Sequence, residues 1–211
     1  MLQPLNDIKQ IFADKNVLQF MQFNPGATAE ELQEFEQHLG VTLPADFKEC
    51  LAEFNGQADT PGMFIGSALL SIDEIKLQWD MLYEVGKDGS LNEDFADSMT
   101  AVPEGYVKPM YVNPKWIPFT HDSGGNYLGI DLDPDVNGTV GQVIIFGRDE
   151  QEKVFVAPSF TAFLTLVRDQ LRTIKWSVKE HEWDIQDKKY NLHYHDLLRT
   201  LLHETDPRYP E

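Results

Sequence analysis

Apolar residues with helical spacing dominate the first 86 positions of the chain. They recur every three or four residues, which places them on one face of an α-helix. The spacing predicts four helices, over residues 5–12, 28–40, 44–56 and 71–86. Thr28 with Glu31, and Ser71 with Glu74, form two capping boxes, in which a hydroxyl and a carboxylate accept hydrogen bonds from free backbone amides. Pro44 suits the first position of the third helix, since its fixed φ is helical.

The period shortens to that of β-strands after a long polar stretch. Residues 87–114 are rich in Gly, Asp, Asn and Pro and are predicted to form a loop with one short helix around 92–99. Four strands are then predicted over residues 116–119, 127–132, 140–146 and 154–156. The apolar run 143–146 is typical of a central strand that is covered on both faces. Because helices precede strands joined by short turns, the predicted class is α+β with an antiparallel meander.

The C-terminal part returns to helical spacing. Ser159 is expected to cap a helix whose apolar side ends at Leu171. Beyond residue 175 a last helix is predicted near residues 188–203, with an apolar stripe at Tyr190, Tyr194, Leu197 and Leu201. Trp176 and Trp183 add more apolar area than a free tail would leave in water. We therefore expect a main domain over residues 1–175 and a helical extension over 176–211 that packs on it.

Charge narrows the range of partners. The 211 residues contain 17 Lys and Arg against 35 Asp and Glu, a net charge of −18. Residues 1–147 hold 7 basic and 23 acidic side chains, a net of −16, so nearly all the negative charge lies in this part. Such a chain repels phosphate backbones and attracts basic proteins, so no nucleic-acid partner is expected. A surface that only keeps the protein soluble is the alternative interpretation of this charge.

Features of targeting and redox chemistry are few. No apolar run has the roughly 18 residues that span a bilayer, so no membrane partner is expected, and the start of the chain lacks a signal-peptide pattern. Cys50 is the only cysteine, which leaves no intramolecular disulfide and no thiolate cluster. These features predict a cytoplasmic protein without a metal or another cofactor.

Two groups of residues suggest metal binding, and each has a simpler interpretation. Asp131, Asp133 and Asp135 resemble the start of a calcium loop, but the sixth and twelfth positions hold Val136 and Gln142 instead of Gly and Glu. A hairpin turn is therefore expected. His193 and His195 resemble a metal pair, but two residues apart on a helix they would point in different directions. They are expected to be partly exposed helix residues.

Evidence for catalysis is also lacking. Cys50 and His38 could be a nucleophile and its base, but Cys50 lies by the apolar face of a predicted helix, where a thiol behaves as a small hydrophobe. The sequence has no nucleophile elbow, phosphate-binding loop, dinucleotide fingerprint or zinc-protease motif. The residues therefore predict that the protein is not an enzyme.

A series of short motifs resembles the SUKH superfamily, which includes the Smi/Knr-type cell-wall assembly regulators of fungi and many bacterial toxin-immunity proteins. The resemblance covers about residues 28–170 and rests on the order and spacing of its motifs. They are Glu30-Glu31-Leu32, Leu39-Gly40, Leu43-Pro44-Ala45-Asp46-Phe47, Asn55-Gly56, Leu69 to Ile75, Trp116-Ile117-Pro118-Phe119, Asp122 to Tyr127, Asp131-Leu132-Asp133-Pro134, Gly138 to Val143, Ala157 to Phe160 and Phe163-Leu164.

The resemblance implies helices packed around a curved, mixed sheet, no enzymatic activity, and binding to a protein partner. Fungal members carry long disordered extensions that are absent here, which favours a bacterial immunity protein that neutralises a basic toxin, such as a nuclease. A regulatory scaffold in cell-wall or glucan synthesis is the alternative, and an undetected enzyme is a third possibility. The toxin, the interface, the oligomeric state and the role of residues 176–211 stay undetermined.

The candidate binding residues come from these motifs and from the charge pattern. The motif candidates are expected to determine the fold first and to bind second: Leu43, Pro44, Asn55, Gly56, Trp116, Asp122, Gly124, Gly125, Asp131, Asp133 and Gly138. Glu30, Glu34 and Glu53 are expected on outward helix faces, where they would form an acidic surface for the partner.

Overall fold

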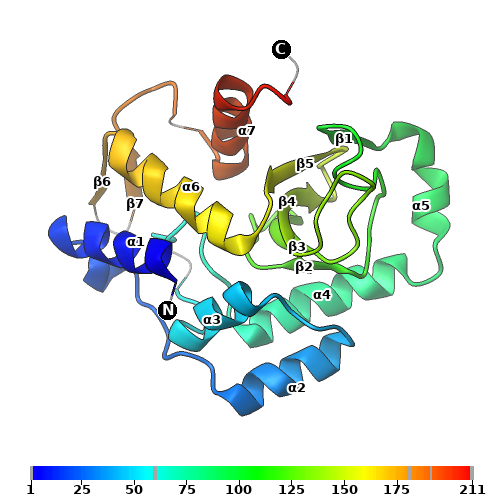
Figure 1. The fold of residues 1–211 in the computed structure, drawn as a ribbon, viewed down its shortest axis with the longest axis horizontal. Coiled ribbons are helices and arrows are strands. Elements are labelled where there is room, and N and C mark those ends of the chain that lie inside the picture. The colour runs from blue at the N-terminus through cyan, green and yellow to red at the C-terminus, as the bar shows by residue number, and fades with distance from the viewer. Residues whose placement is uncertain (1, 59–60, 180–181, 191, 210–211) are drawn as a thin grey trace.

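The computed structural model describes residues 2–58, 61–179, 182–190 and 192–209. These residues form an α+β fold of seven α-helices, a five-stranded mixed sheet and a two-stranded hairpin (Figure 1). The helices are α1 (Gln3–Asp14), α2 (Ala29–Leu39), α3 (Ala45–Glu53), α4 (Ile72–Gly86), α5 (Ser90–Asp94), α6 (Phe160–Thr173) and α7 (Tyr194–Thr205). The strands are β1 (Thr100–Val102), β2 (Trp116–Pro118), β3 (Asn126–Asp131), β4 (Gln142–Gly147), β5 (Glu152–Ala157), β6 (Trp176–Lys179) and β7 (Glu182–Ile185). Two short 3₁₀ turns, η1 (Leu18–Phe20) and η2 (Ala96–Ser98), complete the set.

The main sheet confirms the predicted meander and adds one strand to it. Its order is β1-β5-β4-β3-β2, in which β2 to β5 are antiparallel neighbours and β1 pairs in parallel with β5. β4 is the central strand, and all its residues are buried, as the apolar run predicted. The stretch 87–114 was predicted as a loop with a short helix, and that prediction missed β1. Three residues are too few to show a period of two.

Alternation along the strands sends side chains to two separate cores. Ile117, Leu128, Val143 and Ile145 join the larger core, which also takes in the buried faces of α1, α2, α3 and α6. The residues that alternate with them form a smaller core on the other face, which we call the outer face, together with Val107 from the segment before β2: Trp116, Tyr127, Ile144, Phe146 and Phe155. The sheet is therefore covered on both sides, by helices on one and mainly by the segment before β2 on the other.

The two capping boxes form as predicted, with Thr28 and Ser71 each accepting a hydrogen bond from the backbone amide three residues on. Gly40 ends α2 in the left-handed conformation with φ 66°, where a Cβ would be penalised. Pro44 differs slightly from its prediction, because it is the N-cap residue of α3 and α3 begins at residue 45. The helix boundaries in this half of the chain thus follow local side-chain chemistry.

The C-terminal region differs from the predicted helical extension. It begins with the hairpin of β6 and β7, and only then forms α7, which starts six residues later than predicted. Trp176 is buried against Phe12, and Leu197, Leu198 and Leu202 of α7 are buried on the core, where α7 contacts β5. In Figure 1 the hairpin lies beside α1, whereas α7 lies on the other side of α6. The boundary at residue 175 between a main domain and an extension stays a prediction.

Candidate functional site

The motif residues of the helical half determine the fold. Leu43 is buried, and its backbone N–H donates to the Glu36 side chain at 2.7 Å. Asn55 accepts a hydrogen bond from the backbone N–H of Ile72 at 2.8 Å, which fixes the start of α4. Gly56 has φ +80°, and a Cβ there would lie 2.4 Å from the backbone nitrogen of Ser71. The contacts of Asn55 and Gly56 tie the end of α3 to the start of α4, and the contact of Leu43 ties α2 to the segment before α3.

A second group of motif residues lies where β2, β3 and β4 meet the turn after β3. Trp116 is fully buried beside Phe146, with ring centroids 5.3 Å apart. The buried carboxylate of Asp131 accepts hydrogen bonds from the Gln142 side chain at 2.8 Å and from the backbone of Asp133 at 2.9 Å. Burial outweighs these bonds and raises the pKa of Asp131 to about 6. Both carboxylate oxygens of Asp131 thus accept hydrogen bonds from within the protein, which is consistent with the predicted hairpin turn.

Asp133 and Gly138 complete this turn. Partial burial alone would raise the pKa of Asp133, but hydrogen bonds from Lys108 and Asn113 outweigh it and hold the pKa below its usual value. Gly138 packs so closely that a Cβ would lie 2.3 Å from the Tyr106 carbonyl oxygen. Among the residues that the structure describes, no three His, Cys, Asp or Glu side chains are placed to hold a metal ion.

Asp122, Gly124 and Gly125 form the turn between β2 and β3 at the opposite end of the strands. The Asp122 carboxylate accepts hydrogen bonds from the backbone N–H of Gly124 at 2.7 Å and from the side chain of Asn126 at 2.8 Å. Gly125 has φ +95°, which favours glycine. Asn126 in turn accepts from the backbone N–H of Asp149 at 2.9 Å, so this turn is joined to the next one.

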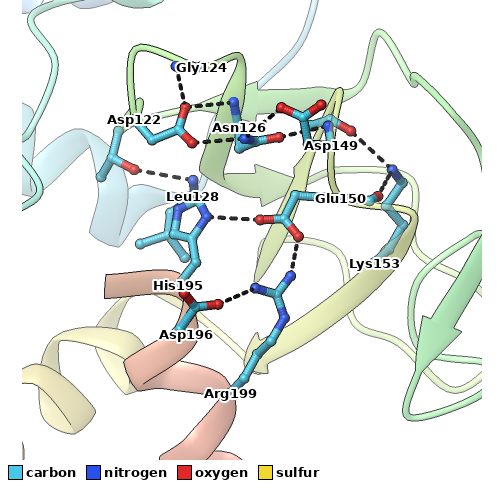
Figure 2. Close-up of polar contacts among 12 residues, drawn as sticks. Asp122, Gly124, Asn126, Leu128, Asp149, Glu150, Lys153, His195, Asp196 and Arg199 are labelled. Carbon is cyan, nitrogen blue, oxygen red and sulfur yellow. Dashed lines mark hydrogen bonds and ion pairs between the residues drawn. The ribbon is translucent and has the colours of Figure 1, made fainter. Parts of the chain in front are cut away.

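Next to this junction lies a network of charged residues that the sequence did not predict (Figure 2). Glu150 lies at its centre, where Nδ1 of His195 is 3.1 Å from one carboxylate oxygen and Arg199 pairs with the other. Lys153 donates to the carbonyl oxygens of Gly147 and Glu150. We call Glu150, Lys153, His195 and Arg199 the Glu150 cluster. It ties α7 to the turn between β4 and β5.

Burial and pairing determine what the Glu150 cluster can do. Burial alone would raise the pKa of Glu150, but the hydrogen bond from His195 and the charge of Arg199 hold it below its usual value. Lys153 is fully buried, which lowers its pKa to about 8 against the weaker attraction of Glu150. His195 is only 2% exposed. The contacts of the Glu150 cluster therefore hold α7 against the turn between β4 and β5.

Two predictions about histidine and cysteine are resolved by this geometry. His195 was expected to be partly exposed, and that is wrong, because it lies on the buried face of α7 against Glu150. His193 precedes α7 as its N-cap, so its ring lies 5.0 Å from that of His195 instead of pointing away from it. Cys50 is buried, which raises its pKa to about 12, and His38 pairs with Asp80 at 2.8 Å.

An apolar groove opens on the outer face of the sheet beside α4, and we call it the α4 groove. Its volume is about 220 Å³. Its apolar lining comes from α4, from the segment before β2 and from the paired strands β3 and β4: Met81, Leu82, Val85, Tyr111, Tyr127 and Phe146. Gly124 and Gly125 also line it, so one predicted motif contributes to the groove. The acidic candidates lie elsewhere: Glu30 and Glu34 are exposed on α2, whereas Glu53 is half-buried and pairs with Lys9.

With this geometry in hand, the chain can be compared with known proteins. A family described as SMI1/KNR4 (SUKH-1) matches residues 26–166, about two thirds of the chain. The chain belongs to the SMI1/KNR4 (SUKH-1) family. The resemblance inferred from the motifs is thereby confirmed. Among the described residues, no helix is both long and apolar enough to cross a membrane.

Several named members of the SMI1/KNR4 family are similar to the chain. It is 34% identical over 182 residues to the cell wall biosynthesis/cell cycle regulator of Schizosaccharomyces pombe, covering 81% of this chain and 36% of that protein. It is 28% identical to the glucan synthesis regulatory protein of Neurospora crassa, covering 85% and 41%, respectively. It is 26% identical to the cell wall assembly regulator of Saccharomyces cerevisiae, covering 87% and 45%. The chain thus spans less than half the length of each of these relatives.

Proposed function

We propose that this chain is a non-catalytic, protein-binding domain that regulates cell-wall or glucan synthesis. The observation that carries the proposal is the contrast between its polar and apolar groups. The charged groups of the Glu150 cluster and of Asp131 are paired within the protein, whereas apolar side chains of α4 stay exposed around an open groove. Exposed apolar surface of this kind is typical of a protein-binding site.

The names of the relatives support the regulatory function more than the toxin-immunity function that the sequence favoured. The S. pombe, N. crassa and S. cerevisiae relatives are fungal and are named for cell-wall biosynthesis, glucan synthesis and cell-wall assembly. A basic toxin as partner has no such support. The preference for a bacterial immunity protein is therefore given up in favour of the regulatory alternative.

A chimera tests the proposal. The region of the S. pombe relative that matches this chain would be replaced by the chain, or by a flexible linker of equal length as a control. We expect the chimera to restore wall glucan content and survival in a glucan-degrading enzyme to near the level of the unmodified strain. Survival no better than with the linker, at equal protein level, would contradict the proposed function.

A further inference from the structure

The outward side of α4 carries an apolar stripe that no other element among the described residues covers. Leu77, Met81 and Val85 lie four residues apart, which places them in one row along the helix. Their exposed fractions are 58%, 47% and 49%. A helix that served only to cover the sheet would have polar residues in this row. The stripe therefore has apolar area to bury against something else.

The α4 groove continues this stripe toward the sheet. Tyr127 and Phe146 lie side by side on β3 and β4, with ring centroids 5.4 Å apart, and both line the groove. Tyr111 lines it from the segment before β2 and stacks on exposed Phe95 at 4.9 Å. The apolar surface thus runs from α4 past the sheet to the end of α5.

Hydrogen bonds keep the groove open. The Tyr127 hydroxyl donates to the Gln78 side chain at 3.0 Å, which fixes α4 relative to β3. The Asn92 side chain donates to the carbonyl of Val112 at 2.9 Å and accepts from its amide at 3.0 Å, which fixes the segment before β2 to α5. A preformed groove binds without the cost of ordering its walls.

The surroundings of the groove are acidic. Residues 73–97, which include α4 and α5, contain eight acidic and two basic side chains, a net charge of −6. Asp88, Glu93, Asp94 and Asp97 are exposed. Lys87 is already paired with Glu84. Arg148, on the turn after β4, is the one cationic side chain among the residues that line the groove in the described part of the chain.

We infer that the α4 groove binds a basic, amphipathic segment of a partner protein, which places apolar side chains between α4 and Tyr111 and Lys or Arg side chains against the acidic residues around it. This inference rests on the proposed function and locates its interface. Charge excludes the other occupants: a second copy of this chain, an anionic membrane and a nucleic acid would each bring negative charge to a negative surface.

Methionine methyl signals allow a direct test. Protein labelled with ¹³C at the methionine methyl groups would be titrated with a helical peptide of leucine and lysine that has one apolar face. We expect the signal of Met81 to shift and those of buried Met21 and Met63 to stay in place. A peptide of equal charge, with serine in place of leucine, should bind at least about tenfold more weakly, because the apolar contact is lost.

Matched variants separate the groove from the rest of the surface. Met81→Asp and Val85→Asp should each weaken peptide binding about tenfold or more. Val136→Asp is the control, because Val136 is 88% exposed in the turn between β3 and β4, at the other end of the strands. Equal loss in all three variants, or an unmoved Met81 signal, would overturn the inference. So would dimerisation of the wild type that Met81→Asp abolishes.

The chimera distinguishes failure of this inference from failure of the proposed function. If the wild-type chimera restores the cell wall and the Met81→Asp chimera does so equally well, the function stands and the groove is not its interface. If the wild-type chimera restores nothing, the proposed function fails, whatever the peptide does. We expect the wild-type and Val136→Asp chimeras to work and the Met81→Asp chimera to fail at equal protein level.

Discussion

The Glu150 cluster and the α4 groove both adjoin Gly147 at the end of β4, and they differ in how their side chains are partnered. In the cluster, a carboxylate, an imidazole, a guanidinium and an ammonium group are bonded to one another or to backbone carbonyls, and the side chain of Arg199 is partly exposed. In the groove, Met81 and Val85 of α4 stay exposed, and the acidic side chains of the segment that follows α4 face solvent.

This difference separates structure from function. The charged groups of the Glu150 cluster are paired with one another or with backbone carbonyls, and these contacts hold α7 on the sheet. Apolar side chains exposed to water can still gain free energy when a partner buries them. The uncharged surface of the α4 groove is therefore a better candidate for a binding site than the Glu150 cluster.

The largest effect on the free energy of unfolding is expected when a leucine is replaced by alanine on α7, in comparison with the same replacement on α4. Leu197→Ala on α7 should lower the free energy of unfolding by about 3–5 kcal/mol, because it leaves a cavity in the core. Leu77→Ala on the stripe of α4 should change it by less than about 0.5 kcal/mol, since the side chain is exposed. Urea unfolding measures both. Similar losses would mean that the stripe is part of the core and would remove the comparison.

Buried Lys153 predicts a pH-dependent stability. Its folded pKa is about 8, below the usual 10.5, so between these values the unfolded state binds more protons and stability rises with pH. The Lys153→Met variant has no charged group to bury at this position, so it should be more stable than the wild type at pH 8. That advantage should shrink by about 3 kcal/mol by pH 10.5. Thermal or urea unfolding across this range gives the difference, and parallel curves would contradict the prediction.

Local chemistry explains which parts of the fold could be predicted from the sequence. The capping boxes at Thr28 and Ser71 and the alternating strands β2 to β5 depend on neighbouring residues, so their patterns are visible in the chain. β1 depends on pairing between Thr100 and Glu152, and three residues carry no period of their own. Its position comes from tertiary contact alone.

The candidate site depends even more on tertiary contact. Glu150 and His195 are 45 positions apart, and nothing in the sequence near either residue indicates the other. The last helix was predicted to begin near residue 188, but α7 begins at Tyr194, and His195, which was expected to be partly exposed, is buried. The stripe Leu77, Met81 and Val85 could have been noticed, since α4 has more apolar positions than one buried face requires.

A smaller effect is expected at the centre of the Glu150 cluster. Glu150→Gln leaves the cations of the cluster without their anion and should lower the free energy of unfolding by about 2 kcal/mol at pH 7. Since the folded pKa of Glu150 lies below its usual 4.5, the stability it contributes is lost as the pH falls through that lower value. The difference between variant and wild type should therefore close in acid. Exposed Glu30→Gln, the control, should change stability by less than about 0.5 kcal/mol at pH 7.

The smallest effect concerns the acidic residues around the α4 groove. The double variant Asp94→Asn/Asp97→Asn removes two exposed negative charges near the groove, and Glu30→Gln/Glu34→Gln removes two exposed charges on α2. Both variants have the same net charge, so they differ only in where the charge is lost. At low salt the first should weaken binding of the leucine–lysine peptide about threefold, and the second should weaken it less.

Salt then shows whether the effect is local. At about 1 M salt the screening length is about 3 Å, so exposed charges no longer act beyond direct contact and both variants should bind like the wild type. What binding remains would come from the apolar contacts of Met81, Val85 and Tyr111, which salt does not screen. Equal losses in the two variants at low salt would mean that the peptide responds to the net charge of −18 and not to the groove. The acidic surroundings would then speed encounter with any basic partner, and specificity would rest on the apolar lining alone.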